Sequence, residues 1–130
     1  PPGYRFMDSR QGFVSILNLA TLAAIARDLG RESLDPRRFR GNILLDGFPA
    51  FAEADWPGRR LTIGDVELEI TKPIDRCAAT DVDPHHGRRD LRMVEALERL
   101  YNHHDCGVYA RIHAGGTLRV GDAARLDDQV

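Results

Sequence analysis

The feature that most restricts the fold is an alternating segment on either side of Gly64-Asp65. Apolar residues occupy every second position over 61–63 and 66–70, which is typical of strands with one buried face. Because Gly-Asp can form a tight turn, the segment predicts an antiparallel hairpin. Residues 118–122 repeat the pattern, with Leu-Arg-Val-Gly-Asp in place of Leu-Thr-Ile-Gly-Asp. Two such segments favour a small antiparallel barrel, in which tight turns join short strands.

Helical patterns occur in two places. Asn18 can cap a helix that runs to Gly30, because its side chain can accept a backbone hydrogen bond and glycine favours the position after a helix end. Asp90 can cap a second helix, which reaches Tyr101. Asp35-Pro36 should open a short helical turn, and further strands are expected at 42–46, 108–112 and 118–120. The sequence therefore predicts an α+β domain: a small, mostly antiparallel β-barrel with a few flanking helices.

Composition restricts the class of protein. A chain of 130 residues, 42% of them hydrophobic, is long enough for one apolar core. Its net charge of −2 provides no basic field for nucleic acid, and no apolar run is long enough to span a membrane. Two cysteines do not make a disulfide framework, which favours a cytoplasmic location. The chain begins Pro-Pro-Gly without methionine, so we expect one domain over 1–130 that lacks an N-terminal segment of the full-length protein.

Cys77 is the residue with the most versatile chemistry. It follows Arg76 in a segment after Pro73, where we expect the preceding strand to end because proline cannot donate a ladder hydrogen bond. An irregular backbone at this point is free to approach a ligand. A thiolate is both a nucleophile and a soft metal ligand, so Cys77 is a candidate for either role. The alternative is a small buried apolar side chain, a common environment for free cysteine.

Three arginines crowd into one turn: Arg37, Arg38 and Arg40. The planar guanidinium group can bind phosphate through two parallel hydrogen bonds, so this turn is a candidate anion site. A solvated, charged turn is the alternative, and the residues alone leave both interpretations open.

Two histidine pairs and two cysteines invite a zinc interpretation: His85-His86, His103-His104, Cys77 and Cys106. Their spacing matches no zinc finger or ribbon, and adjacent histidines do not easily face one ion, so we favour solvent-facing histidines. Glu53 and Asp55 could suggest acid–base catalysis, but loop carboxylates are the simpler interpretation. The chain has no phosphate loop, no HExxH and no GxSxG motif.

Several motifs taken together resemble the MOSC domain. They are Arg-Phe-Arg-Gly-Asn at 38–42, a loop containing Glu53, Asp55 and Trp56, the Gly-Asp hairpin, Arg76-Cys77, and Thr-Asp-Val-Asp-Pro at 80–84. Residues 116–122 resemble the last hairpin of that family, and the likeness runs from about residue 6 to residue 126. The MOSC domain forms the C-terminal part of molybdenum cofactor sulfurases and the core of the mitochondrial amidoxime-reducing component and its bacterial relatives.

The resemblance implies a role for each matching residue. Cys77 matches the cysteine that binds molybdenum beside the dithiolene sulfurs of the pterin, and it would be the catalytic residue. Arg40, Asn42 and Arg76 match residues that hold the phosphate and pterin of the cofactor. Thr21, in the first helix, matches a hydroxyl contact to the same group. Cys106 has no counterpart in the family pattern.

Three functions are compatible with the resemblance. The first is molybdenum cofactor (molybdopterin) binding in a reductase of N-hydroxylated or related N–O compounds. Such a reductase would need an electron-donor protein of iron–sulfur or flavin type, because the chain has no iron–sulfur cysteine pattern. The second is a sulfur carrier, in which Cys77 accepts a persulfide from a partner cysteine desulfurase that uses pyridoxal phosphate. The third is a non-catalytic module for cofactor delivery or interaction.

Overall fold

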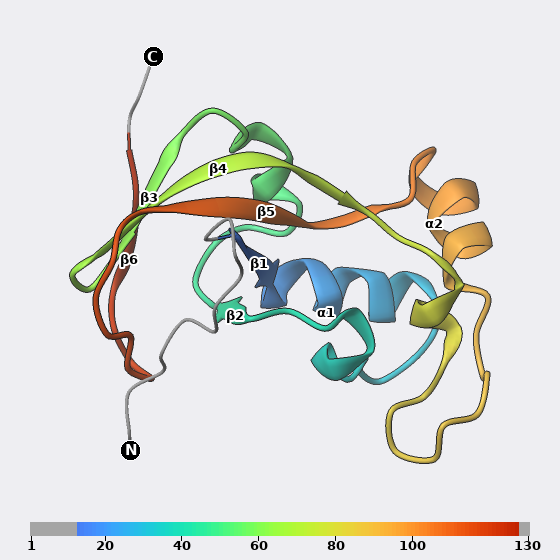
Figure 1. Ribbon diagram of the computed structural model, residues 1–130. Helices are drawn as coiled ribbons and strands as arrows, with labels where there is room; N and C mark the ends of the chain where they lie inside the picture. The colour runs from blue at the N-terminus through green and yellow to red at the C-terminus, as the bar shows by residue number, and fades with distance from the viewer. Residues whose placement is uncertain (1–12, 128–130) are drawn as a thin grey trace.

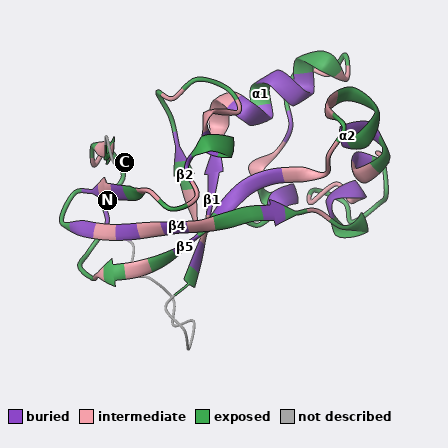
Figure 2. Cartoon of the chain, turned by 90° about the horizontal axis from the view of Figure 1, so that it is seen from above, coloured by how far each residue is buried: buried purple, intermediate pink, exposed green. Residues whose placement is uncertain are grey.

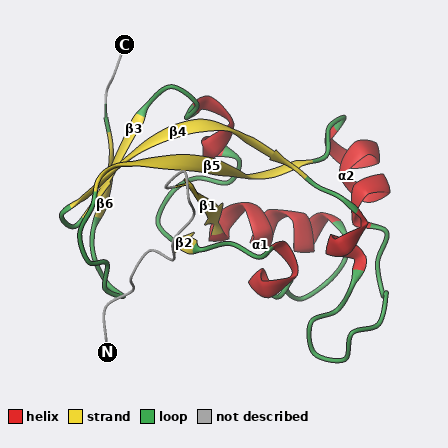
Figure 3. Ribbon diagram, in the orientation of Figure 1, coloured by secondary structure: helices red, strands yellow, loops and turns green. Residues whose placement is uncertain are grey.

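The computed structural model describes residues 13–127. Two α-helices, three short 3-10 helices (η) and six strands lie within them. In chain order they are β1 (Phe13–Asn18), α1 (Leu19–Asp28), η1 (Pro36–Phe39), β2 (Ile43–Leu45), η2 (Ala52–Asp55), β3 (Arg60–Ile63), β4 (Val66–Asp75), η3 (Ala78–Asp81), α2 (Met93–Tyr101), β5 (Asp105–Ala114) and β6 (Ala124–Leu126). This mixture confirms the predicted α+β class (Figure 3).

The strands form one curled sheet. Their order is β2-β1-β5-β4-β3-β6, and β1 runs parallel to β2 while the other neighbouring pairs are antiparallel. The sheet curls into a half-barrel, with α1 along one side and α2 beyond the ends of the long strands β4 and β5 (Figure 1). The predicted small, mostly antiparallel barrel is confirmed in this form.

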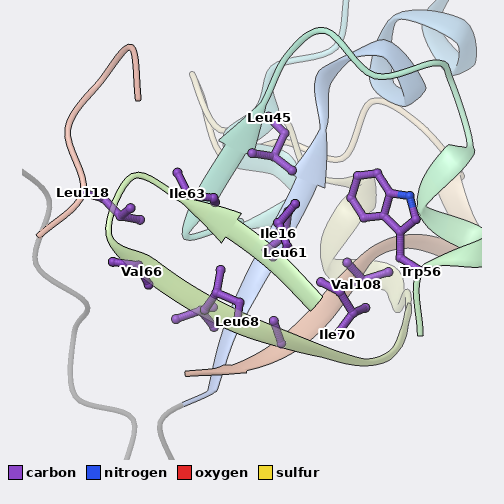
Figure 4. Close-up of a cluster of buried hydrophobic side chains, with 12 residues drawn as sticks. Ile16, Leu45, Trp56, Leu61, Ile63, Val66, Leu68, Ile70, Val108 and Leu118 are labelled. Atoms are coloured by element: carbon purple, nitrogen blue, oxygen red, sulfur yellow. The ribbon is translucent and has the colours of Figure 1, made fainter. Parts of the chain in front are cut away.

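The hairpin around Gly64-Asp65 is formed by β3 and β4. Ile63 pairs with Val66 and Leu61 with Leu68, so the apolar positions of both strands lie on the same face. This face is the centre of the main core, which Figure 4 shows as side chains converging from several strands. The fully or nearly buried residues of this cluster include Ile16, Leu45, Trp56, Leu61, Ile63, Val66, Leu68, Ile70, Val108 and Leu118.

The strand β4 does not end at Pro73, contrary to the prediction. It continues to Asp75, and Pro73 pairs with Val108 of β5. The pairing of β3 with β4 reaches only Glu69, so this last part of β4 lies at an edge of the sheet. The ladder with β5 is also irregular on both sides of the proline. Proline is tolerated at edges and bulges because no regular ladder bond is lost there.

The prediction of a strand at 118–120 is wrong, since only Leu118 forms an isolated bridge there. Residues 120–121 lie in a turn, in which the Asp122 N–H donates to the Arg119 carbonyl at 3.0 Å and the Arg119 N–H donates to the Asp122 carboxylate at 2.9 Å. The side chain of Asp122 thus occupies a backbone donor that a ladder would use. The strand that forms is β6, which follows this turn and pairs with β3.

The first helix has the predicted ends. The Asn18 side chain accepts a hydrogen bond from the Ala20 N–H at 3.1 Å, and Gly30 has the positive φ of +73° expected after a helix. Buried residues of α1 pack with η1, α2 and β5 in a second core cluster, and Figure 2 colours much of the middle of α1 as buried. Within residues 13–127, no helix is both long and apolar enough to cross a bilayer.

The second helix is capped by a different residue from the one predicted. It begins at Met93, whose N–H donates to the Asp81 carboxylate at 2.6 Å. Asp90 instead accepts hydrogen bonds from arginine side chains. Both aspartates precede the helix, but the loop between η3 and α2 folds back so that Asp81 lies over the helix start. The helix is therefore anchored to the segment that directly follows Cys77.

Candidate functional site

Cys77 lies between the end of β4 and the start of η3, and its thiol is free and exposed. Its backbone is fixed, since the Cys77 carbonyl accepts hydrogen bonds from the Thr80 N–H at 3.1 Å and the Thr80 hydroxyl at 2.7 Å. The side chain is thus presented from an ordered turn, and the alternative of a buried, apolar cysteine does not apply. An exposed thiol at a fixed backbone position can act as a nucleophile or as a metal ligand.

Arg76 ties this turn to two other parts of the fold. Its guanidinium donates from Nε to the Cys106 carbonyl and from Nη1 to the Phe39 carbonyl, both at 2.8 Å, and it lies over the Phe39 ring. No carboxylate within residues 13–127 pairs with it, and its Nη2 is buried without an acceptor. Burial lowers the pKa of Arg76, which is the expected response of a cation that lacks a compensating anion.

Arg40 is the next residue after Phe39, so the bond from Arg76 brings residue 40 toward the Cys77 turn. Arg40 has a positive φ of +52° at the end of η1, and its side chain is exposed. Nothing among the described residues accepts a hydrogen bond from its guanidinium. Two arginines without carboxylate partners among the described residues, Arg40 and Arg76, therefore lie on two segments that the Arg76–Phe39 hydrogen bond joins, and Cys77 is the next residue after Arg76.

Asn42 lies two residues after Arg40 and is joined to β1 through Ser15. Its Oδ1 accepts hydrogen bonds from the Ser15 N–H at 2.8 Å and the Ser15 hydroxyl at 3.1 Å. These bonds fix the orientation of the side-chain amide, and its Nδ2 has no acceptor in the part of the chain that is described. Asn42 therefore serves the fold through one end of its amide and presents donors at the other.

The other two arginines of the predicted anion turn are occupied. Arg37 is exposed and paired with Asp35 at 2.7 Å, and this hydrogen bond lowers the pKa of Asp35 to about 2. The Arg38 side chain is only 3% exposed and binds Asp90 through two parallel hydrogen bonds of 2.9 and 3.1 Å. Of the three residues, Arg40 alone has a guanidinium with no partner among residues 13–127.

Thr21 lies in a separate polar cluster. Its hydroxyl is buried, donates to the Glu53 carboxylate at 2.7 Å and accepts from the Phe51 N–H at 2.8 Å. The amide of Asn18 also donates to Glu53, at 2.9 Å. No hydrogen bond joins this cluster to the Cys77 turn within the described residues, so the predicted cofactor contact of Thr21 stays a prediction. Glu53, taken from the sequence for a loop carboxylate, is only 6% exposed.

The histidines do not gather around a metal. The four histidines of the two pairs have different partners: His85 pairs with Asp35, His86 with Asp83, His103 with the Asp105 N–H, and His104 with Asp75 and Glu98. Among residues 13–127, no three His, Cys, Asp or Glu side chains converge in a way that could hold a metal ion. Cys106 is buried, which raises the pKa of its thiol to about 12 and makes it chemically inert.

The sequence matches a known family over most of its length. The model of the MOSC domain covers residues 3–125. The chain is 33% identical to human mitochondrial amidoxime-reducing component 1 over 125 residues, which cover 85% of this chain and 36% of the human protein. It is 30% identical to molybdenum cofactor sulfurase of Caenorhabditis briggsae over 130 residues, which cover 92% of this chain and 18% of that protein. The chain thus spans well under half the length of these relatives.

Solved structures show the same fold at lower sequence identity. YiiM from Geobacillus stearothermophilus matches with a TM-score of 0.65 and 17% identity, over 88% of this chain and 54% of that one. The YUAD protein from Bacillus subtilis matches with a TM-score of 0.63 and 16% identity, over 87% of this chain and 62% of that one. At these identities the likeness concerns the arrangement of the strands and helices alone.

Proposed function

The chain belongs to the MOSC domain family, and from this premise we propose that it binds a molybdenum cofactor with Cys77 as the protein ligand of the metal. The relatives that share its sequence are named for molybdenum-cofactor chemistry, which supports a role related to that cofactor. Because the chain spans only part of those relatives, the activity, substrates and partners of the whole protein are part of the proposal.

The observation that carries the proposal is the charge around the Cys77 turn. Arg76 and Arg40 lie on segments joined by one hydrogen bond, and neither has a carboxylate partner among residues 13–127. A phosphate group is the anion that best matches guanidinium geometry, and it would pair with the exposed Arg40. The exposed thiol of Cys77, the next residue after Arg76, can provide the soft sulfur donor that suits molybdenum. These residues therefore fit an anionic cofactor with a metal at one end.

Each residue would have a separate task. Cys77 would bind the metal, Arg40 the phosphate, and the free Nδ2 of Asn42 an acceptor on the pterin. Arg76, whose guanidinium is held inside the fold, would position the turn and add positive charge rather than reach the ligand. The bound cofactor would supply oxygen-atom and electron transfer, as in a reductase of N-hydroxylated or related N–O compounds. An electron-donor protein of iron–sulfur or flavin type would be the partner.

A second candidate function follows from the exposure of Cys77. In a sulfur carrier, the thiolate would attack a persulfide on a pyridoxal-phosphate cysteine desulfurase and take over its outer sulfur. An accessible thiol is what such a transfer requires. A third hypothesis is a non-catalytic module for cofactor delivery or interaction. The cytoplasmic location expected from the cysteine count also remains a proposal, because one relative is named as mitochondrial.

Metal and pterin analysis tests the first candidate. We expect protein made in a host that synthesises the cofactor to carry molybdenum and pterin in near-equal amounts. Cys77→Ser should lose the metal, because a hydroxyl is a poor soft donor, while pterin can remain through Arg40. Cys106→Ala is the matched control: it removes the buried thiol and should leave the metal content unchanged. Stoichiometric zinc without pterin would contradict the proposal.

Intact-mass measurement separates the two candidate functions. The protein is incubated with a cysteine desulfurase and cysteine, and its mass is compared with that of Cys77→Ser treated in the same way. A sulfur carrier gains one sulfur atom that the variant does not gain. If no sulfur is added while a reduced dye drives turnover of an N-hydroxylated base, the carrier function is excluded.

A further inference from the structure

A cavity lies next to Cys106, the residue whose carbonyl accepts a hydrogen bond from Arg76. It has a volume of about 400 Å³ and lies between η2, the end of α2 and the start of β5. Three rings form part of its wall: Phe51 and Tyr101 are 4.8 Å apart between centroids, and His103 stacks on Tyr101 at 6.1 Å. Volumes of this size are typical of pockets for small molecules.

The charge of this cavity is opposite to that of the Cys77 turn. Two carboxylates line it, Glu53 and Asp105, and no lysine or arginine is among its lining residues. Glu53 is held by neutral donors only, the side chains of Asn18 and Thr21. The Asp105 carboxylate accepts no hydrogen bond and forms no ion pair with any residue of the described part of the chain. The cavity therefore contains acidic groups whose charge nothing in residues 13–127 balances through a direct contact.

The combination of aromatic rings and unbalanced carboxylates restricts the ligand. An anion such as a phosphate would be repelled, so the cavity is unsuited to the group proposed for the Cys77 turn. A cation is attracted both to the carboxylates and to the faces of aromatic rings. An apolar body attached to that cation would pack against the part of the wall formed by Phe51, Pro73 and Val108. We propose that this cavity binds a small organic cation, an amine or ammonium compound with an apolar body of about one ring.

This second site does not depend on the function proposed for Cys77. The two sites share a wall, since Arg76 donates to the Cys106 carbonyl and Cys106 lines the cavity. Gly107 is packed against the same guanidinium: a Cβ there would lie 3.2 Å from Arg76 Nη2. A ligand in the cavity would therefore contact the segment of β5 that holds Arg76, and through it the residue before Cys77.

Binding of a matched pair of probes tests the proposal. Benzylamine carries a positive charge at neutral pH, and benzyl alcohol has the same ring and length without charge. With ¹⁵N-labelled protein, we expect benzylamine to shift the amide signals of Gly107 and Val108. Its affinity should be at least about tenfold higher than that of benzyl alcohol, as expected for one charge-assisted interaction. Equal affinity of the two probes, shifts that map to another surface, or no binding of benzylamine would overturn the proposal.

Single-charge variants locate the binding. Asp105→Asn keeps the shape of a side chain that has no partner, so it should fold normally and bind benzylamine several-fold more weakly. Asp55→Asn removes the same charge from an exposed position on η2 outside the cavity and should bind as the wild type does. Because Glu53→Gln alters a buried hydrogen-bonded cluster, it is used only after its unfolding temperature has been compared with that of the wild type. Unchanged affinity in Asp105→Asn, or equal losses in both aspartate variants, would refute the site.

Discussion

Replacing Asp90 by alanine should destabilise the protein strongly, although Asp90 lies in a surface loop. The Arg38 side chain is only 3% exposed, and Asp90 provides both oxygens of its bidentate contact. Removing one partner of a buried ion pair strands the other charge, which costs about 3–5 kcal/mol. Because the Asp90 side chain is itself 22% exposed, we expect the lower end, about 3 kcal/mol. For a domain of this size that is a fall of about 10 °C in unfolding temperature.

Urea or thermal unfolding of four proteins measures this effect: wild type, Asp90→Ala, Arg38→Met, and the double variant. The double variant strands no charge, so it should be more stable than Asp90→Ala alone. Arg31→Ala, which removes the other arginine bound to Asp90 at a partly exposed position, should cost less than about 1 kcal/mol. If the double variant is at least as unstable as Asp90→Ala, the burial of Arg38 is not the source of the cost and the reasoning is wrong.

Three further outcomes are expected. Arg40→Ala should lower cofactor affinity about tenfold or more, since a charged hydrogen bond to phosphate is worth about 1.5–3 kcal/mol, whereas Arg37→Ala should retain the cofactor occupancy of the wild type. Equal cofactor occupancy in Arg40→Ala and the wild type would show that the turn is only a solvated surface. Gly107→Ala should lower the unfolding temperature by several degrees, because its φ is +86° and a Cβ would lie 2.8 Å from a backbone oxygen; unchanged melting would contradict this. Hydrogen bonding to Asp75 raises the pKa of His104 above 6.5. The wild type should therefore be more stable than His104→Gln below pH 6.5 and lose that advantage as the pH rises further. A difference in unfolding free energy that stays constant across pH would refute this.

The parts of the fold that sequence could predict are those set by neighbouring residues. The Asn18 cap, the positive φ of Gly30 and the hairpin at Gly64-Asp65 each depend on a few consecutive positions. The exposed, irregular setting of Cys77 was also predictable, although the strand before it ends two residues later than Pro73 indicated. In each case the conformation that the neighbouring residues favour is also the one found in the folded protein, because no distant segment imposes a different one.

The parts that sequence could not predict depend on distant contacts. The sequence predicts Asp90 as the cap of α2, and only the return of the intervening loop brings Asp81 to the helix start in its place. Arg38 and Arg40 are identical in type and two residues apart, yet one is buried against Asp90 and the other is exposed. The burial of Glu53 likewise depends on donors more than thirty residues away, Asn18 and Thr21. No periodicity or motif carries such information.

The position of β1 in the sheet has a consequence for how the chain is made. This strand is the first described element, yet it lies between β2 and β5, and its register pairs Phe13 with Arg111. During synthesis, β1 must wait for almost a hundred further residues before its second neighbour exists. Until then β1 leaves one row of backbone hydrogen-bonding groups unpaired, and so does β4, the neighbour of β5 on its other side. A ribosome-bound or truncated chain that stops before β5 would therefore expose two unpaired strand edges, which can pair with other chains and lead to aggregation.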